Sequence, residues 1–227
     1  MKINNLEEKK VFSFDKNFSY KIFFSKPDKY KLLEEVSRKN NDIINIGSNL
    51  SYSPLGFGKD SVSISIKKFD RILNFNKNEK TITLEAGASL IDLLNITLKY
   101  NLWIPQLPGY PTITIGGAVA ANSHGKSCGS HGTIRKSIKN ILLFHKQNGW
   151  MNLSETENKD IFDLTIGGLG LTGTIVNVTF NLEEIESTEF ITSKKQVKSI
   201  TECQKAISQT KNKSTFIYSW HRADNTG

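Results

Sequence analysis

Two histidines, a lysine and a cysteine gather in one glycine-rich stretch of the chain. Residues 107–133 contain His124, Lys126, Cys128 and His131 together with six of the sixteen glycines. Glycine at this density lets the backbone approach a ligand closely. An imidazole or ammonium group beside such a turn can move a proton or hold an anion. We interpret the stretch as one wall of a cofactor pocket, with His124 and Lys126 as candidate catalytic residues.

Other interpretations of these side chains stay open. His124 could serve the structure alone, by donating to a backbone carbonyl. His124, Cys128 and His131 follow the spacing H-x3-C-x2-H, which is close to that of zinc ligands, but no fourth ligand stands nearby unless His145 returns. No base is spaced to activate Cys128 as a nucleophile. We expect no metal here.

Two more turns of small residues flank this stretch. The first, residues 47–53 (G-S-N-L-S-Y-S), follows a predicted strand and offers backbone N–H groups that could surround an anion. It is neither a Walker loop nor a G-x-G-x-x-G fingerprint, so an ordinary turn is the alternative. The second, residues 167–173 (G-G-L-G-L-T-G), leads into a predicted strand.

The spacing of apolar residues predicts the elements that carry these turns. We expect a helix from Pro27-Asp28 to about residue 39, and another over 89–100 with Ser89 as its N-cap. A third should follow a capping box of Ser154 and Glu157, and a fourth should cover 200–210. Residues 1–21 are interpreted as a surface cover and 69–73 as a packing segment. Strands are expected over 42–46, 62–66, 81–85, 138–145, 150–153, 174–182 and 215–220.

Acidic residues are missing from a long central window. The net charge is +8, and the window between Asp92 and Glu155 holds six Lys or Arg but no Asp or Glu. This suits an anionic ligand such as a diphosphate, although a lysine-rich composition alone could produce the total. The scattered lysines do not predict nucleic-acid binding. With no apolar run of about 18 residues, no signal-like N-terminus and two cysteines, we expect no transmembrane segment and a cytoplasmic location.

Composition changes sharply near residue 183. Fifteen of the sixteen glycines lie between Gly47 and Gly173, and the chain beyond is rich in Lys, Glu, Ser and Thr. We place a domain boundary there, with residues 14–186 forming one domain and residues 187–227 the start of a second that is cut short.

Four segments carry a resemblance to a known family: E-A-G-A-S-L (85–90), L-W-I-P-Q-L-P-G (102–109), T-I-G-G-A-V-A-A-N-S-H-G-K (114–126) and G-G-L-G-L-T-G-T-I-V (167–176). Over about residues 20–185 the chain resembles the FAD-binding domain of the vanillyl-alcohol oxidase / p-cresol methylhydroxylase (PCMH-type) family. Its H-G-K element is similar to the sugar-oxidase branch that includes decaprenylphosphoryl-β-D-ribose oxidase. The resemblance implies an α+β fold: a PCMH-type FAD-binding domain of two α/β subdomains, then the truncated start of an α+β substrate (cap) domain.

The resemblance also implies which residues meet FAD. It assigns the pyrophosphate to the backbone of Gly47, Ser48, Asn49, Leu50, Ser51 and Tyr52. It assigns the flavin to Gly109, Thr114, Ile115, Gly116, Gly117, Ala121, Asn122 and His124. It assigns further cofactor contacts to Gly168, Gly173 and Ile175, with the adenine end near the backbone of Thr174 and Ile175. Asn49 and Ser53 replace two glycines of the family loop; Asn still tolerates positive φ, so we expect the loop to survive. The loop has no histidine, so FAD should be bound non-covalently.

The implied activity is oxidation of an alcohol carbon of a sugar, a sugar phosphate or a lipid-linked sugar, by hydride transfer to flavin N5. The implied partners are that small-molecule substrate and a reductase that would complete an epimerase pair. The resemblance implies that the family's usual base would lie beyond Gly227, so we expect residues 1–227 alone to bind FAD poorly or incompletely and not to turn over. The alternatives are an aldonolactone or alditol oxidase, a flavoenzyme like UDP-N-acetylenolpyruvoylglucosamine reductase (which shares G-S-N-L at 47–50), a non-catalytic FAD module and a zinc protein.

Overall fold

The structure is a computed structural model that describes residues 6–211 and 213–222. Its first sheet has four strands in the order β1-β2-β4-β3. β1 and β2 form an antiparallel hairpin, while β4 runs parallel to both β2 and β3. The strands are β1 (Glu7–Phe12), β2 (Ser19–Ser25), β3 (Ile43–Ile46) and β4 (Val62–Ser65).

The second sheet has five antiparallel strands in the order β5-β6-β10-β8-β9. Asn148 and Gly149 connect two of these strands, since Gly149 has φ 75° and opens the second strand of the β8–β9 hairpin. The strands are β5 (Ile72–Asn76), β6 (Thr81–Glu85), β8 (Ile138–His145), β9 (Gly149–Ser154) and β10 (Thr174–Asn181).

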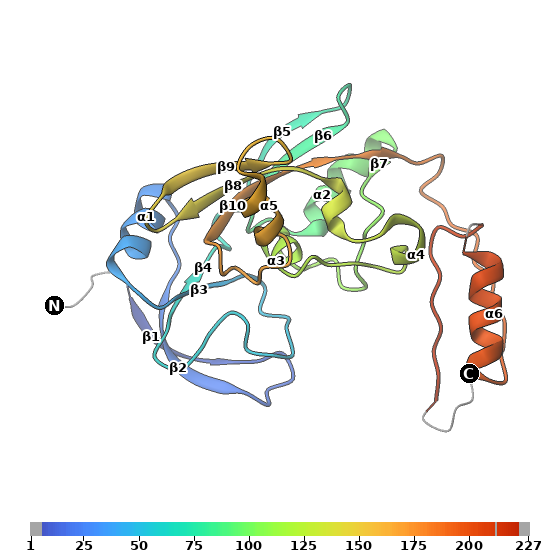
Figure 1. Ribbon diagram of the computed structural model, residues 1–227, viewed down its shortest axis with the longest axis horizontal. Helices are drawn as coiled ribbons and strands as arrows, with labels where there is room; N and C mark the ends of the chain where they lie inside the picture. The colour runs from blue at the N-terminus through green and yellow to red at the C-terminus, as the bar shows by residue number, and fades with distance from the viewer. Residues whose placement is uncertain (1–5, 212, 223–227) are drawn as a thin grey trace.

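Helices join the two sheets around one shared core. Leu33 and Val36 of α1 pack with Val62 and Ile64 of β4, and the same cluster takes in the inner faces of β6, β8 and β10. α3 lies at the centre of the molecule between the sheets (Figure 1). The mixed helix-and-sheet fold is thus confirmed. The helices are α1 (Tyr30–Lys39), α2 (Leu90–Thr97), η1 (Leu98–Tyr100), α3 (Ile115–Ala120), α4 (Cys128–His131), η2 (Ile134–Ser137), α5 (Lys159–Thr165) and α6 (Ile200–Thr210).

The start of α2 is confirmed. The Ser89 hydroxyl accepts from the backbone N–H of Asp92, and the Asp92 carboxylate accepts from the backbone N–H of Ser89, which is a complete capping box. The corresponding prediction at Ser154 is wrong. Its hydroxyl accepts from the N–H groups of Thr156 and Glu157 within a connecting turn, and α5 begins only at Lys159.

Glycines 116 and 117 lie in a helix, whereas we had predicted a turn there. Thr114 caps α3 by accepting from the N–H of Gly117, at 3.2 Å. A Cβ on Gly116 would come within 2.9–3.0 Å of Ile66 and Ala86. Close packing between the sheets therefore favours glycine at position 116 in spite of its low helix propensity.

Three other segments also differ from the prediction. Residues 7–12 and 19–25 form the β1–β2 hairpin, not an irregular surface cover, and β5 begins within the predicted packing segment. Residues 215–220 form no strand. Phe216 instead packs with Trp103 and Phe190, with ring centroids 5.6 and 5.2 Å away, so its aromatic character serves a side-chain cluster.

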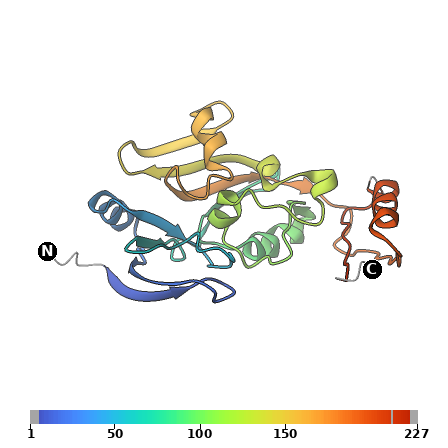
Figure 2. The same ribbon diagram turned by 60° about the horizontal axis from the view of Figure 1, so that its bottom comes forward.

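The chain after β10 leaves the two sheets. β11 (Glu183–Glu184) pairs with β7 (Leu102–Trp103), and α6 then stands apart from both sheets (Figure 2). Apart from α6, the described residues after Glu184 form neither helix nor strand.

Candidate cofactor site

The turn at residues 47–53 is in direct contact with the segment that leads into α3. The hydroxyl of Ser48 donates to the carbonyl of Thr112 at 2.9 Å. A Cβ on Gly47 would lie 2.2 Å from Thr114 Oγ1, so only glycine allows the chain leaving β3 to pass the N-cap of α3 this closely. The loop 47–53 and the start of α3 therefore form one continuous surface.

The turn at residues 167–173 contacts the opposite end of α3 and the strand before the loop 47–53. The N–H groups of Gly167 and Leu169 donate to Val119 and Ala120, the last residues of α3. The amide of Asn45, two residues before Gly47, donates to the Gly173 carbonyl at 3.3 Å and accepts from the Thr174 hydroxyl at 2.8 Å. The structure thus brings together three glycine-rich segments, 47–53, 107–133 and 167–173, that are more than thirty residues apart in the sequence.

The loop 47–53 keeps its backbone donors free. None of the N–H groups of residues 48–53 donates a hydrogen bond to another described residue. Asn49 has φ 56°, as expected from its replacement of glycine. Successive unpaired N–H groups around a left-handed residue form a concave site for anions.

The far end of α3 carries unpaired polar atoms as well. Asn122 Oδ1 and Ser123 Oγ are buried and have no hydrogen-bond partner among the described residues. Buried polar atoms normally have hydrogen-bond partners, and atoms without them mark a place where a ligand or water belongs. Gly109 and Gly117 are exposed, and no atom lies within 4 Å of a Cβ placed on Gly109. This surface has room for a flat ligand.

His124 and Lys126 follow directly. Both are exposed, and His124 forms an isolated antiparallel bridge with Thr133. The ammonium of Lys126 lies 3.9 Å from the ring centroid of Tyr218, and its carbonyl accepts from the N–H of Ile217. Lys126 is therefore held by the segment after α6 as well as by its own loop.

Gly125 and Gln106 fix the loop that carries these two residues. A Cβ on Gly125 would lie 1.8 Å from the Leu107 carbonyl oxygen, so the two backbones touch there. Gln106 is fully buried; its amide donates to the His131 carbonyl at 3.0 Å and accepts from the Ser137 hydroxyl at 2.7 Å. The glycine of H-G-K is thus a packing requirement, a role that spacing alone does not reveal.

Not every predicted cofactor residue presents a side chain to this surface. Ile115 and Ile175 are core residues, 0% and 5% exposed, and Gly116 is buried between Ile66 and Ala86. Their backbone groups are also engaged: the N–H groups of Ile115 and Gly116 donate to Ala88 and Ala86, and Ile175 pairs with Leu143 of β8. Gly168 packs on the carbonyl of Leu164. These four residues support the site from behind.

An ion pair that we did not predict lies behind the α2–α3 face. The Glu85 carboxylate is fully buried and accepts from Tyr30 at 2.5 Å, from the Arg71 guanidinium at 2.8 and 3.1 Å, and from the Arg71 backbone. Burial favours a raised pKa for Glu85, but these hydrogen bonds outweigh it and lower that pKa. Sequence reasoning could have found this residue from its position, because Glu85 is a carboxylate at the end of a predicted strand.

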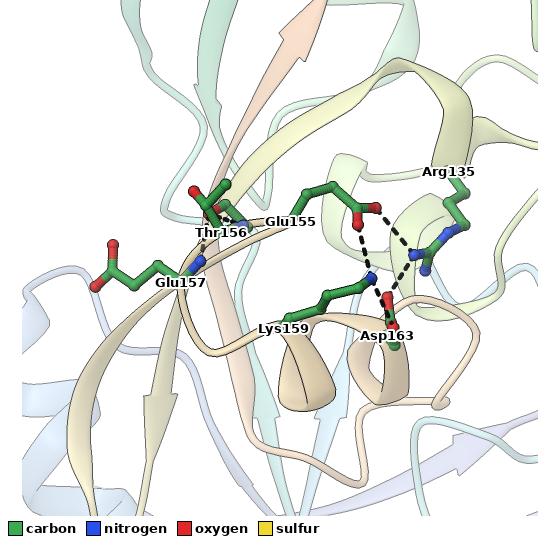
Figure 3. A network of polar contacts seen from close by, with 7 residues as sticks. Arg135, Glu155, Thr156, Glu157, Lys159 and Asp163 are labelled. Carbon is green, nitrogen blue, oxygen red and sulfur yellow. Dashed lines mark hydrogen bonds and ion pairs between the residues drawn. The ribbon is translucent and has the colours of Figure 1, made fainter.

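A surface network supports the third turn. Arg135 of η2 bridges Glu155 and Asp163, and Lys159 bridges the same two carboxylates (Figure 3). Hydrogen bonds from Arg135 and then Lys159 lower the pKa of Asp163. The network ties α5, which leads into residues 167–173, to η2, which follows the loop of His124 and Lys126.

Other features lie away from the three turns. Two hollows of about 430 Å³ each occur on the surface, one across the five-stranded sheet beside Thr83 and Thr179, the other beside Tyr30 and Arg71. Within the described ranges no group of three or more His, Cys, Asp or Glu could hold a metal ion. The Cys128 side chain, part of the zinc alternative, lies outside what is described. Among the described helices, none has both the length and the apolar character that a membrane crossing requires.

Comparison with known proteins decides the family. A family model described as an FAD binding domain matches residues 28–154, more than half of the chain, and this region includes the glycine-rich segments 47–53 and 107–133. The chain belongs to this family. The resemblance to PCMH-type FAD-binding domains is thereby confirmed, and the loop 47–53, α3 and the loop of His124 and Lys126 lie within the matched FAD-binding region.

Individual relatives are oxidases and dehydrogenases. The chain is 29% identical over 150 residues to decaprenylphosphoryl-β-D-ribose oxidase of Mycolicibacterium smegmatis, covering 66% of this chain and 33% of the relative. It is 31% identical over 133 residues to a probable L-gulonolactone oxidase of Arabidopsis thaliana, covering 56% and 23%. It is 26% identical over 188 residues to D-arabinono-1,4-lactone oxidase of Candida glabrata, covering 75% and 35%. The matches thus span only about a quarter to a third of these relatives.

The residues present fit FAD. The free N–H groups of residues 48–53 suit its diphosphate, the open surface at Gly109 and Gly117 suits a planar ring, and the unpaired Asn122 and Ser123 oxygens offer it hydrogen bonds. The acid-free window between Asp92 and Glu155 keeps carboxylates in that segment from opposing the anion.

Proposed function

We propose that this protein is an FAD-dependent oxidoreductase that oxidises an alcohol carbon of a sugar, a sugar phosphate or a lipid-linked sugar. The observation that carries the proposal is the meeting of the three glycine turns around α3, with unpaired backbone donors at residues 48–53. In this proposal FAD is bound non-covalently and supplies a hydride acceptor.

The residues of the chain then take these roles. The N–H groups of residues 48–53 hold the diphosphate, and Gly109 and Gly117 leave space for the ring. Asn122 and Ser123 hydrogen-bond to the ring edge or to an ordered water. His124 takes the hydroxyl proton of the substrate, and Lys126 holds an anionic part of it. The adenine end meets the backbone near Gly173 and Thr174.

Residues 14–186 form the cofactor domain in this proposal, and residues 187–227 begin the substrate domain. The contacts of Ile217 and Tyr218 with Lys126 support this division, because they bring the later segment over the loop that faces the substrate. A cytoplasmic location and a partner reductase stay predictions.

A flavin spectrum with substrate bleaching tests the proposal. The full-length protein that contains this chain should, when purified, show flavin absorbance that is released by acid precipitation. Under anaerobic conditions it should bleach with sugar alcohols, phosphorylated sugars or lipid-linked sugars. His124→Ala should bind FAD with unchanged affinity and bleach at least tenfold more slowly, since general-base catalysis contributes about a hundredfold or more. Flavin that stays in the acid pellet, or bleaching unaffected by His124→Ala, would refute the corresponding role.

A second candidate substrate is an aldonolactone. The identities with L-gulonolactone and D-arabinono-1,4-lactone oxidases favour it. The same bleaching assay, run with aldonolactones beside the sugars, separates the two: the substrate class that bleaches the flavin at lower concentration is the one to retain.

A further inference from the structure

Asn49 has an unusual backbone conformation and a side chain that hydrogen-bonds to another element of the fold. It is the only residue of the loop 47–53 with positive φ, at 56°. Its side-chain Nδ2 donates to the carbonyl oxygen of Phe12, the last residue of β1, at 2.7 Å. Asparagine is among the few residues that occupy this left-handed region routinely. The hydrogen bond therefore connects the left-handed residue of the loop to the end of strand β1.

The β1–β2 hairpin holds the same loop at a second place. The N–H of Phe14 donates to the Ser51 carbonyl at 3.2 Å. The Phe14 ring also meets the Tyr52 ring edge-on, with centroids 5.7 Å apart. The hairpin therefore contacts loop residues on both sides of Leu50.

All of the loop's hydrogen bonds share one property. Ser48 uses its hydroxyl, Asn49 its side-chain amide, and Ser51 and Ser53 their carbonyls. None uses a backbone N–H of residues 48–53 toward another described residue. The contacts that hold the loop open therefore leave its donors available. A loop without them could relax toward self-pairing, because unpaired N–H groups are costly when they lose water.

We propose that Asn49 is a positioning residue for FAD. Its hydrogen bond to Phe12 fixes the left-handed turn and so holds the N–H groups of residues 48–53 in the arrangement that receives the diphosphate. This rests on the proposed function, in which the loop 47–53 binds that part of the cofactor. The family glycine at this position would supply the turn but not the tether.

The test is FAD affinity, measured by quenching of flavin fluorescence, in variants at residue 49. Asn49→Gly keeps the turn and loses only the tether, so FAD should bind about 3–10-fold more weakly, the value of one hydrogen bond. Asn49→Ala also disfavours positive φ and should bind about 10–100-fold more weakly. Riboflavin, which has no phosphate, should bind all three proteins with affinities within about twofold of one another.

Asn158 provides a matched control. It too is left-handed, with φ 50°, and its Nδ2 donates to the Asn152 carbonyl at 2.8 Å, at the start of α5. Asn158→Ala should leave FAD affinity within about twofold of the unaltered protein, even where its melting temperature falls. A similar loss of affinity in Asn49→Ala and Asn158→Ala would assign the effect to general stability and overturn the proposal.

Two other results separate a failure of the Asn49 inference from a failure of the proposed function. If the unaltered protein binds FAD and Asn49→Gly binds it equally well, the tether has no role and the inference fails alone. If the unaltered protein binds no FAD, the proposed function fails and this inference falls with it. Asn49→Gly keeps the test decisive where Asn49→Ala does not fold.

Discussion

The phenol of Tyr30 donates a 2.5 Å hydrogen bond to the carboxylate of Glu85, fifty-five residues further along the chain. Arg71 donates to the same carboxylate from its guanidinium and its backbone. Because Glu85 ends β6 beside the turn that receives α3, this one carboxylate links α1, the start of β5 and the layer under the cofactor site.

Replacing the Glu85 carboxylate should destabilise the protein markedly. The Glu85→Gln substitution replaces the charged carboxylate, to which Arg71 and Tyr30 donate hydrogen bonds, with a neutral amide. A hydrogen bond to a charged group contributes about 1.5–3 kcal/mol. We expect the free energy of unfolding, measured by urea titration at pH 7, to fall by about that amount. Glu157→Gln is the control, since that side chain is exposed and makes no ion pair among the described residues.

The same variant has a defined pH dependence. The pKa of Glu85 is lowered from its ordinary 4.5, so its contribution is complete above that value and is lost as the pH falls through the lower folded-state pKa. The stability difference between the unaltered protein and Glu85→Gln should therefore be constant from pH 5 to 7 and shrink in stronger acid. A difference that grows in acid would contradict this assignment.

The raised pKa of Tyr30 predicts how the stability of the protein changes at alkaline pH. Burial, followed by the hydrogen bond to Glu85, raises its pKa from 10.0 to about 12. A raised tyrosine pKa means that the protonated form stabilises the fold below pH 10, and that this contribution is lost as the pH rises through 12. Tyr30→Phe should be less stable than the unaltered protein at pH 9, and the two denaturation midpoints should converge by pH 12. Parallel midpoints over this range would refute the prediction.

Two glycines of one loop should respond oppositely to alanine. At Gly125 the new methyl would lie 1.8 Å from Leu107 oxygen, and overpacking of this kind costs about 1–3 kcal/mol. Gly125→Ala should thus lower the melting temperature and weaken FAD binding. At Gly129, in α4, a Cβ meets no atom within 4 Å, so Gly129→Ala should be neutral or slightly stabilising. Equal effects at the two positions would show that contact with Leu107 does not decide the loop's stability.

The charge network on α5 should matter little and depend on salt. Asp163→Asn removes one partner of both Arg135 and Lys159, all of them substantially exposed. Exposed pairs contribute little and are screened by salt. We expect a small drop in melting temperature at low ionic strength that disappears in about 1 M NaCl. A large drop that persists in salt would indicate that the network holds α5 against η2 by packing.

Local signals predicted much of the fold and of the site. Ser89 and Asp92 predicted the start of α2 because a capping box needs only three residues of separation. The small residues of 47–53 and 167–173 predicted the turns, and Asn49 predicted a left-handed residue. The short range of these interactions makes them visible in the sequence.

What could not be predicted depends on distant partners. Gly116 is helical because Ile66 and Ala86 leave it no space for a side chain, and helix propensity contains no such information. Residues 215–220 have the pattern of a strand, but among the described residues Phe216 packs against Trp103 in place of strand pairing. The pairings of Glu85 with Tyr30 and of Lys126 with Tyr218 join segments that periodicity cannot relate.

The place of β10 in the second sheet has a consequence for synthesis of the chain. β10 lies between β6 and β8, yet it is the last of the five strands in the sequence. Until residue 181 has emerged from the ribosome, the β5–β6 and β8–β9 hairpins have no strand between them, and each exposes unpaired backbone edges. Pairings this distant in sequence form slowly. A nascent chain arrested before Thr174 should therefore be protease-sensitive and prone to associate, whereas one released after Leu182 should be protected.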